Sequence, residues 1–461
     1  MTKVKPRIGV MLLAYKAEKE AAETIMPAYL KLLKELKNKG LDVVASAKYL
    51  LTENETINEA EYLKKENIDI FILMVGTWTN ANYGLAAVKI MENTPLILYS
   101  FNDIGPGMTF KLNAPTFGFT GSIEIKNSLD QMGKKDEFFF IVGSPFEDKT
   151  IKKIETICVL AAVAKKLSSS KIGLIGYYTM GMYSATFDPI NIKAKFGVSV
   201  EHIGENILIN EINNIDEKKA KEVINDRIER CTIVDKNITN NKEIIENGKM
   251  YLAYNNLIKK FELDAVNTKC DPELSFYYGR CACLTHSLLN DDGVMTACEG
   301  DIHQTITMMI LHYLTGKSIM FLDIIGACEE NNSLQFQSCG YAPISLAKNC
   351  EDVKLYPQID MKGKGVTQSY VLEPGKEVTI YRIDGSYPRG LYSGHIISGH
   401  TSKSARAIEQ WPATEIILKK PNGWEHFTQN CTADHFALVF GDYVEDLLIF
   451  NQLLKLENIL T

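Results

Sequence analysis

The sequence predicts an α/β protein in which two Rossmann-like, parallel-sheet domains are followed by a β-rich, barrel-like C-terminal domain. Strand-like apolar runs alternate with amphipathic helical stretches in the first third of the chain. The same alternation restarts near residue 170, and β-rich segments with frequent turns follow from about residue 353. The chain of 461 residues has room for about three such domains.

The first domain is expected to span residues 1–169. Its predicted strands cover residues 7–14, 41–49, 68–78, 95–100 and 137–145, and its predicted helices cover residues 17–38, 58–66 and 149–167. The strands are short and almost wholly apolar, which is typical of a parallel sheet that helices cover on both faces.

The second domain is expected to span residues 170–352, after the polar break Ser168-Ser169-Ser170. Its predicted strands cover residues 171–177, 199–204, 265–270, 294–299 and 319–324, with a helix over 302–315. Pro-Gly, Asp-Gly and Asn-Gly turns then separate the segments of an antiparallel domain over 353–461, which is expected to end in an amphipathic helix. Residues 435–440 fit either a strand or a helix.

Composition and charge narrow the functional classes. The formal net charge is −7 with acids and bases interspersed, so a nucleic-acid partner is not expected. No run approaches the roughly 18 apolar residues of a membrane span, and the N-terminal apolar run lacks a signal-peptide cleavage site, so we expect a cytoplasmic protein. Residues 173–181 lack the second glycine of G-x-G-x-x-G, which disfavours a nicotinamide-dependent enzyme.

The ten cysteines are expected to be reduced thiols in that compartment. Four of them gather in one segment: Cys270, Cys281, Cys283 and Cys298. Their spacing, C-x10-C-x-C-x14-C, lacks the paired C-x2-C motifs of structural zinc sites. The spacing therefore predicts packed thiols and not zinc.

Two acidic residues close predicted strands of the second domain. Glu299 ends the run VMTACE directly before the predicted helix, and Asp323 ends IMFLD 24 residues later. A strand, helix and strand fit between them, so a right-handed crossover would place both carboxylates at neighbouring positions on one sheet edge. Adjacent carboxylates repel each other, and a shared metal ion relieves the repulsion.

A histidine would complete a site for Mn²⁺, Mg²⁺ or Fe²⁺ with positions left open for substrate oxygens. His435 is the first candidate, because it follows the polar stretch 430–434 and enters a new secondary-structure element. His303, four residues after Glu299, is its nearest rival. Asp301 is interpreted as the N-cap of the helix over 302–315, which requires no catalytic role.

The segment KCDPELSFYYGRCACLTHSLLNDDGVMTACEGD (269–301), followed by TITMMILHYLTGKSIMFLDI (305–324), resembles the metal-bearing segment of the L-fucose isomerase and L-arabinose isomerase superfamily. The likeness extends to GTW (76–78), CGYAP (339–343) and DHFALVFGD (434–442), and it is greater to the shorter fucose-isomerase-like relatives than to the full-length enzyme.

The resemblance implies a metal-dependent aldose–ketose isomerase that acts on a free or modified sugar. It implies that Glu299, Asp323 and His435 bind Mn²⁺, with Mg²⁺, Fe²⁺ or Co²⁺ as other possible ions, and that the two carboxylates also handle the proton. A bound ion would chelate the adjacent oxygens at C1 and C2, and a carboxylate would move the proton between these carbons through a cis-enediolate.

The resemblance also suggests substrate contacts. It places Trp78 in the active site of a neighbouring subunit, which implies a homo-oligomer, either a hexamer or a trimer. Asp271 and Ser338 stand where the family usually has glutamine and histidine, so both bear on substrate choice. Trp424 and Asn430 are the remaining candidates for contact with the sugar.

Two alternatives stay open. One is an isomerase for a sulfonated or phosphorylated hexose, which needs a basic group to bind the anion; the candidates are Lys269, Arg280, Arg382 and Arg389. The other is a non-catalytic sugar-binding paralogue that keeps the fold. The presence of all three candidate metal ligands disfavours it.

Overall fold

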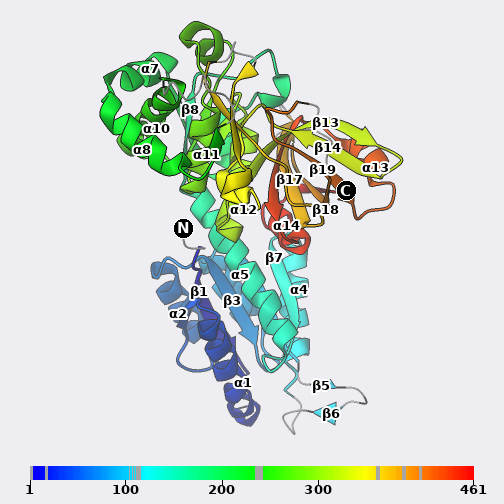
Figure 1. The fold of residues 1–461 in the computed structure, drawn as a ribbon. Coiled ribbons are helices and arrows are strands. Elements are labelled where there is room, and N and C mark those ends of the chain that lie inside the picture. Colours follow the sequence, from blue (N-terminus) through cyan, green and yellow to red (C-terminus); the bar gives the residue numbers. More distant parts are fainter. Residues whose placement is uncertain are drawn as a thin grey trace. The chain divides into compact units, whose positions relative to one another are not determined.

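The computed structural model describes residues 4–15, 19–102, 104–105, 107, 109–110, 116–233, 242–359, 364–386, 391–403 and 408–461. These residues form two compact units (Figure 1). The N-terminal unit comprises Val4–Lys165 and Gln452–Lys455, and the C-terminal unit comprises Lys166–Asn451 and Leu456–Thr461. No helix in the part of the chain described here is long and apolar enough to cross a membrane.

The N-terminal unit contains a five-stranded parallel sheet in the order β2-β1-β3-β4-β7. Its strands are β1 (Arg7–Leu13), β2 (Asp42–Ala45), β3 (Ile70–Val75), β4 (Leu96–Phe101) and β7 (Phe138–Gly143). The helices between and after them are α1 (Lys19–Asn38), α2 (Glu53–Lys65), α3 (Ala81–Ile90), α4 (Gly118–Gln131) and α5 (Asp148–Ser168), and the short strands β5 (Ile104–Gly105) and β6 (Thr109–Phe110) pair separately. Every residue of β3 and β4 is buried, so the sheet is covered on both faces as predicted.

The C-terminal unit begins with a second parallel sheet in the order β12-β11-β8-β9. Its strands are β8 (Lys171–Ile175), β9 (Ser199–Ile203), β11 (Ala265–Thr268) and β12 (Met295–Cys298). The helical elements are η3 (Tyr183–Ala185), α6 (Pro189–Phe196), α7 (Glu205–Asn214), α8 (Glu217–Ile228), α10 (Lys242–Phe261), the π-helix η4 (Glu273–Tyr278), α11 (Cys283–Asp291) and α12 (Ile302–Thr315). The restart of the α/β pattern at residue 170 is therefore confirmed.

A closed six-stranded antiparallel barrel follows, in the order β17-β20-β13-β14-β19-β18, with β17 paired to β18. Its strands are β13 (Met320–Cys328), β14 (Ser333–Gln337), β17 (Glu377–Ser386), β18 (Leu391–Ser402), β19 (Ala413–Leu418) and β20 (His435–Phe440). Apolar side chains such as Leu322, Phe336 and Ile380 belong to its buried core. The β-rich, barrel-like prediction is confirmed (Figure 1).

The smaller elements complete the C-terminal unit. Strands β10 (Thr232–Ile233), β15 (Lys354–Pro357) and β16 (Val366–Ser369) form a three-stranded sheet, and β21 (Glu457–Leu460) adds to β18 in parallel. Two short 3-10 helices, η5 (Ile344–Leu346) and η6 (Cys350–Asp352), precede β15, and the helices α13 (Gly423–Asn430) and α14 (Val444–Leu453) flank β20. The predicted terminal helix is present as α14, but a strand follows it.

Two expectations about the centre of the chain are wrong. The predicted strand at 319–324 does not continue the second parallel sheet, because β13 pairs antiparallel with β14 and β20 in the barrel. No crossover therefore places Glu299 and Asp323 on one sheet edge: the first follows β12 and the second lies in β13, in different sheets.

Residues 435–440, which fitted either a strand or a helix, form strand β20. The division at residues 169 and 352 stays a prediction.

Candidate metal centre

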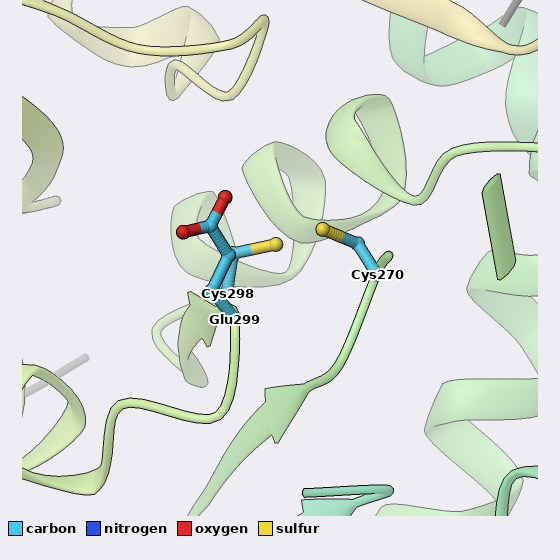
Figure 2. A group of neighbouring side chains, drawn as sticks. All are labelled: Cys270, Cys298 and Glu299. Carbon is cyan, nitrogen blue, oxygen red and sulfur yellow. The ribbon is translucent and has the colours of Figure 1, made fainter. Parts of the chain in front are cut away.

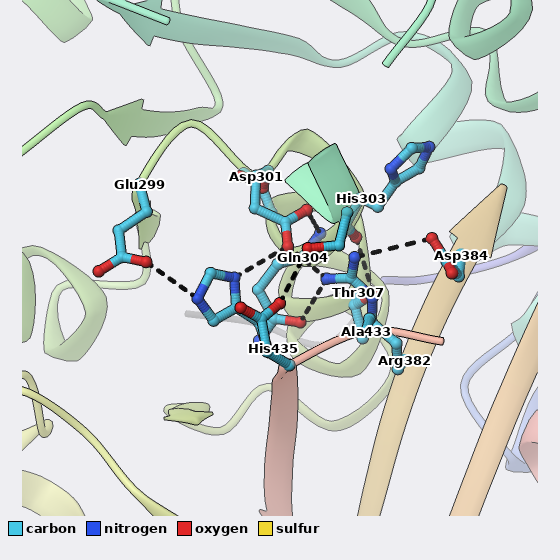
Figure 3. A network of polar contacts seen from close by, with 12 residues as sticks. Glu299, Asp301, His303, Gln304, Thr307, Arg382, Asp384, Ala433 and His435 are labelled. Carbon is cyan, nitrogen blue, oxygen red and sulfur yellow. Dashed lines mark hydrogen bonds and ion pairs between the residues drawn. The ribbon is translucent and has the colours of Figure 1, made fainter. Parts of the chain in front are cut away.

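The side chains of Glu299, Asp323 and His435 meet within the C-terminal unit. His435 Nε2 lies 3.1 Å from Glu299 Oε2 and 3.4 Å from Asp323 Oδ1 (Figure 3 shows the contact with Glu299). The His435 side chain is 1% exposed, whereas Glu299 keeps 13% and Asp323 keeps 31% of their surface in contact with solvent. The structure thus brings together the three residues that the sequence singled out as metal ligands, and both carboxylates remain within reach of small molecules.

Strand pairing explains the contact between Asp323 and His435. In the antiparallel pair of β13 and β20, Asp323 is directly opposite His435. Directly opposed side chains on one face of such a pair have Cβ atoms about 4.5–5.5 Å apart. Glu299 arrives from the carboxyl end of β12, so the site lies where the second parallel sheet meets the barrel.

The turn that carries Glu299 has an unusual backbone. Glu299 has a φ of 68°, in the left-handed region that residues with a Cβ rarely adopt. Gly300 has a φ of 81°, and a Cβ there would lie 2.2 Å from the carbonyl oxygen of Tyr177, so glycine is required. Asn267, buried in β11, accepts from the Gly300 N–H at 2.7 Å and donates to the Asp301 carbonyl at 2.8 Å. These bonds hold the turn that directs Glu299 toward His435.

Asp301 binds the other nitrogen of the His435 ring. Asp301 Oδ2 lies 3.0 Å from His435 Nδ1 and accepts a hydrogen bond of 2.6 Å from Arg382 (Figure 3). Asp301 Oδ1 accepts from the Gln304 N–H, which confirms the predicted N-cap of α12. A carboxylate that binds Nδ1 fixes the orientation of the imidazole and leaves Nε2 for a ligand. Asp301 therefore contacts the His435 ring as well as capping α12, a contact that its interpretation as a cap missed.

The charges of the cluster shift its proton affinities. Burial raises the pKa of Asp323 to about 7, the Glu299 charge adds to the rise, and His435 opposes it. Burial lowers the pKa of His435, but hydrogen bonds to Asp301 and Glu299 outweigh it and hold this pKa well above its usual value. Burial raises the pKa of Asp301, but the Arg382 charge and the His435 hydrogen bond outweigh it, so Asp301 is ionised.

The donor set fits a hard divalent cation. Two carboxylates and one imidazole are ligands that Mn²⁺ and Fe²⁺ accept, and three protein ligands leave coordination positions open. Without a cation, the raised pKa of His435 favours a proton on Nε2, where it would face both Glu299 and Asp323 and offset their repulsion. A cation that replaces this proton would satisfy the same two carboxylates, while Asp301 continues to hold Nδ1.

A cavity of about 130 Å³ adjoins Glu299. Asp271, one of the predicted substrate contacts, lines this cavity, and its Oδ1 accepts a hydrogen bond of 2.7 Å from Ser275. The ring of Phe321, which also lines the cavity, lies 4.8 Å from the His435 ring between centroids. The remaining lining residues are Met180, Cys270, Ser275, Phe276, Cys281, Ala282, Cys283, His286, Cys298, Cys339, Tyr341 and Gln358.

The other predicted substrate contacts lie elsewhere. Ser338 is buried, and its hydroxyl accepts from the Tyr341 N–H at 3.2 Å. Trp424 packs against the barrel core, and Asn430 donates to the His426 carbonyl at 2.8 Å in the same helix, α13. None of these three lines the cavity. Trp78 belongs to the N-terminal unit, where its ring packs edge-on against Tyr15 with centroids 4.7 Å apart.

The rival histidine does not join the cluster. His303 lies in α12, and its ring packs near Tyr392 with centroids 5.8 Å apart. Burial lowers its pKa, and the nearby Arg382 charge lowers it further. Arg382, a candidate for binding an anion, is instead 1% exposed and paired with Asp301. In the strand YRID (381–384), alternation places Arg382 on the face opposite Tyr381 and Ile383, so no signal in the sequence indicated that Arg382 is buried.

The chain is similar over most of its length to proteins named sulfoquinovose isomerase. The protein from Clostridium sp. (strain MSTE9) is 24% identical over 450 residues, which cover 94% of this chain and 95% of that protein. The protein from Priestia aryabhattai is 26% identical over 431 residues, which cover 92% of each, and the one from Alkalicoccus urumqiensis is 24% identical over 395 residues, or 84% and 85%.

Two other comparisons add little. No family model matches the sequence. A periplasmic sugar-binding protein of an ABC sugar transporter from Legionella pneumophila matches 68% of this chain and 97% of its own, with 9% identity and a TM-score of 0.18, which is too low to indicate a shared fold.

Proposed function

We propose that this protein is a divalent-metal-dependent aldose–ketose isomerase of the fucose and arabinose isomerase type, and that its substrate is a sulfonated aldose. The observation that carries the metal-dependent chemistry is the convergence of Glu299 and Asp323 on Nε2 of His435, whose Nδ1 is held by Asp301. Similarity to sulfoquinovose isomerases across more than nine-tenths of the chain supports the reaction and the class of sugar.

Glu299, Asp323 and His435 would hold the ion, with Mn²⁺ as the expected occupant. The ion would polarise the sugar carbonyl at C1 and the adjacent hydroxyl at C2, which acidifies the C–H at C2. Isomerisation then requires a base that takes the proton from C2 of the aldose and returns it to C1, through a cis-enediolate of the sugar, while the proton of the C2 hydroxyl passes to the oxygen at C1. The partly exposed carboxylates of Glu299 and Asp323 are the candidates for this base. Asp301 and Arg382 keep the imidazole of His435 in place while the charge at the site changes.

Recognition of a sulfonate needs cationic side chains whose charge is not already paired with a carboxylate of the protein. Lys269 is bound to Glu273 at 2.9 Å, Arg280 to Glu243 at 3.3 Å, and Arg382 to Asp301 at 2.6 Å. Arg389 lies outside the described residues. The proposal therefore assigns the sulfonate to none of the three described candidates.

A panel of sugars tests the proposal. Metal-stripped protein is reloaded with Mn²⁺ and incubated with sulfoquinovose, a phosphorylated hexose, L-fucose and L-arabinose, and ketose formation is measured. The proposal predicts turnover of sulfoquinovose above the others, with loss of the activity in Asp323→Asn. Turnover of the phosphorylated hexose alone would correct the substrate class. Binding of sulfoquinovose with no ketose formed under any divalent ion would favour the non-catalytic paralogue.

A further inference from the structure

Half of the cysteines of the chain gather at the cavity beside Glu299. They are Cys270, Cys281, Cys283, Cys298 and Cys339. The sequence spacing gave no zinc motif, yet residues far apart in the sequence become neighbours here. The Sγ atoms of Cys270 and Cys298 and a carboxylate oxygen of Glu299 all lie within 4.8 Å of one another. Figure 2 shows that the two sulfur atoms point toward each other, with the Glu299 carboxylate beside Cys298.

The parallel sheet produces this arrangement. Cys298 is the last residue of β12 and is in register with Thr268, the last residue of β11, while Cys270 follows two residues later. The Glu299 N–H donates to the Thr268 carbonyl at 2.8 Å, which holds the two strand ends together. The donors thus come from adjacent strand ends that backbone hydrogen bonds hold together.

The other three cysteines have contacts of their own. The Cys281 thiol donates to the Val366 carbonyl and the Cys283 thiol to the Cys339 carbonyl, at sulfur–oxygen distances of 3.8 and 3.7 Å. Thiol–thiol hydrogen bonds link Cys283 with Cys281 and Cys339, and another links Cys270 with Cys298. Among the described residues, what distinguishes Cys270 and Cys298 is a carboxylate oxygen, that of Glu299, within 4.8 Å of both sulfur atoms.

We propose that Cys270, Cys298 and Glu299 form a second cation site, selective for a thiophilic divalent ion such as Zn²⁺, and that occupation of this site removes Glu299 from the centre it shares with Asp323 and His435. Thiolates select soft ions, whereas carboxylate and imidazole ligands serve Mn²⁺. A tetrahedral ion with Zn–S bonds of about 2.3 Å spaces its ligands by roughly 3.5–3.8 Å. Donors within 4.8 Å reach that spacing through small side-chain shifts.

Binding of Zn²⁺ at this site and inhibition of the isomerase by the bound ion are separate claims. Zn²⁺ binding replaces the two thiol protons, which pass to solvent, and the adjoining cavity has room for water as a fourth ligand. The consequence, inhibition of the isomerase because Glu299 is a ligand of both ions, rests on the proposed function. Inhibition should be relieved by a zinc chelator and not by added sugar.

Cadmium is the probe for binding, because its thiolate complexes absorb in the ultraviolet. Metal-stripped full-length protein, kept reduced with a phosphine, is titrated with Cd²⁺ and then with Zn²⁺ in competition, without Mn²⁺ or sugar. Wild type is expected to take up one ion with a thiolate band. Cys270→Ser and Cys298→Ser should each weaken binding by about 100-fold, the loss expected for one of a few ligands. Cys328→Ser is the matched control, since Cys328 ends β13 and does not line the cavity.

An unchanged band in both Cys270→Ser and Cys298→Ser would overturn the proposal. Cys298 is 8% exposed and Cys270 is partly exposed, so Cys270→Ser keeps the test available where Cys298→Ser does not fold. The second readout is the Zn²⁺ concentration that halves the Mn²⁺-dependent rate, with each variant referred to its own rate without Zn²⁺. This concentration should rise at least about tenfold in Cys270→Ser and stay unchanged in Cys328→Ser.

The two readouts separate the two proposals. A thiol-dependent cadmium band in a protein that isomerises no sugar would support the second cation site and overturn the proposed function. An active isomerase whose Cd²⁺ binding does not depend on Cys270 and Cys298 would support the proposed function and overturn the second cation site.

Discussion

Substitution of Asp301 by asparagine tests the charge of the carboxylate that orients His435. Asparagine keeps an acceptor oxygen but removes the charge that Arg382 and the imidazole share. Both Asp301 and Arg382 are buried, and the guanidinium would retain Gln304 Oε1 at 3.4 Å and the Asp384 carboxylate at 3.8 Å. Removing one partner of a buried ion pair costs about 3–5 kcal/mol of unfolding free energy. Loss of a carboxylate behind a metal-binding histidine weakens metal affinity by about 10–100-fold.

A second substitution separates these two effects. Replacement of both charges of a buried pair by uncharged groups is often tolerated. The double variant Asp301→Asn/Arg382→Met should therefore melt at a higher temperature than Asp301→Asn alone. Its Mn²⁺ affinity should stay as weak as that of the single variant, because His435 still lacks its charged partner.

The assays are thermal melts of the metal-free proteins and calorimetric titration with Mn²⁺. The reasoning predicts that stability recovers in the double variant and that metal affinity does not. Wild-type Mn²⁺ affinity in Asp301→Asn, with a loss of stability alone, would refute the positioning role of Asp301. Parallel recovery of stability and affinity in the double variant would refute it as well.

Four further predictions follow, three from the same centre and one from Trp78. Glu299→Gln should keep the fold and lose most of both metal content and turnover, since it removes a ligand charge and a proton acceptor; near-normal turnover at full metal occupancy would exclude the assignment. Mn²⁺ affinity should rise with pH across about pH 7, because the raised pKa values of Asp323 and His435 let protons compete with the ion. A group whose pKa is raised in the folded state stabilises that state at low pH, so the metal-free protein should lose stability as pH rises through about 7. Calorimetric titration with Mn²⁺ and thermal melts of the metal-free protein, each at about pH 6 and about pH 8, measure the two effects. Affinity and stability that do not change with pH would contradict these predictions. If Trp78 reaches the active site of a neighbouring subunit, Trp78→Ala should weaken substrate binding and separated monomers should be inactive. Monomers that are identified by sedimentation and remain active in the enzyme assay would exclude a shared site.

Local signals made much of the fold predictable. The run after Ser168-Ser169-Ser170 forms β8, and the predicted helix over 302–315 has the bounds of α12. Asp301 caps that helix at its start, and Gly316, with a φ of 70°, ends it. These features depend on residues that are close together in the sequence, so they can be predicted from the sequence alone.

Contacts between distant segments were not predictable in the same way. The apolar run that contains Asp323 fits a buried strand of either sheet, and its antiparallel partner β20 begins at His435, far along the chain. Asp301 and His435 are separated by 134 residues, so no spacing rule links them. The ligand set was therefore predicted from residue types and a family resemblance, while the sheet geometry inferred for it was wrong.

The approach of Cys270 to Cys298 shows the same limit. Zinc motifs are recognised by short spacings within one turn or knuckle. Here the two thiols reach each other because adjacent parallel strands end in register, and the sequence does not show which strands are adjacent.

The central claim is that Glu299, Asp323 and His435 hold a divalent ion on which the reaction depends. Titration of metal-stripped protein with Mn²⁺, followed by electron paramagnetic resonance, tests it most directly in wild type and Asp323→Asn. Asp323 is the residue to change, because it does not belong to the proposed thiol site. The account predicts one bound Mn²⁺ per chain in wild type and none at the same concentrations in Asp323→Asn. Equal Mn²⁺ binding by the two proteins would contradict it.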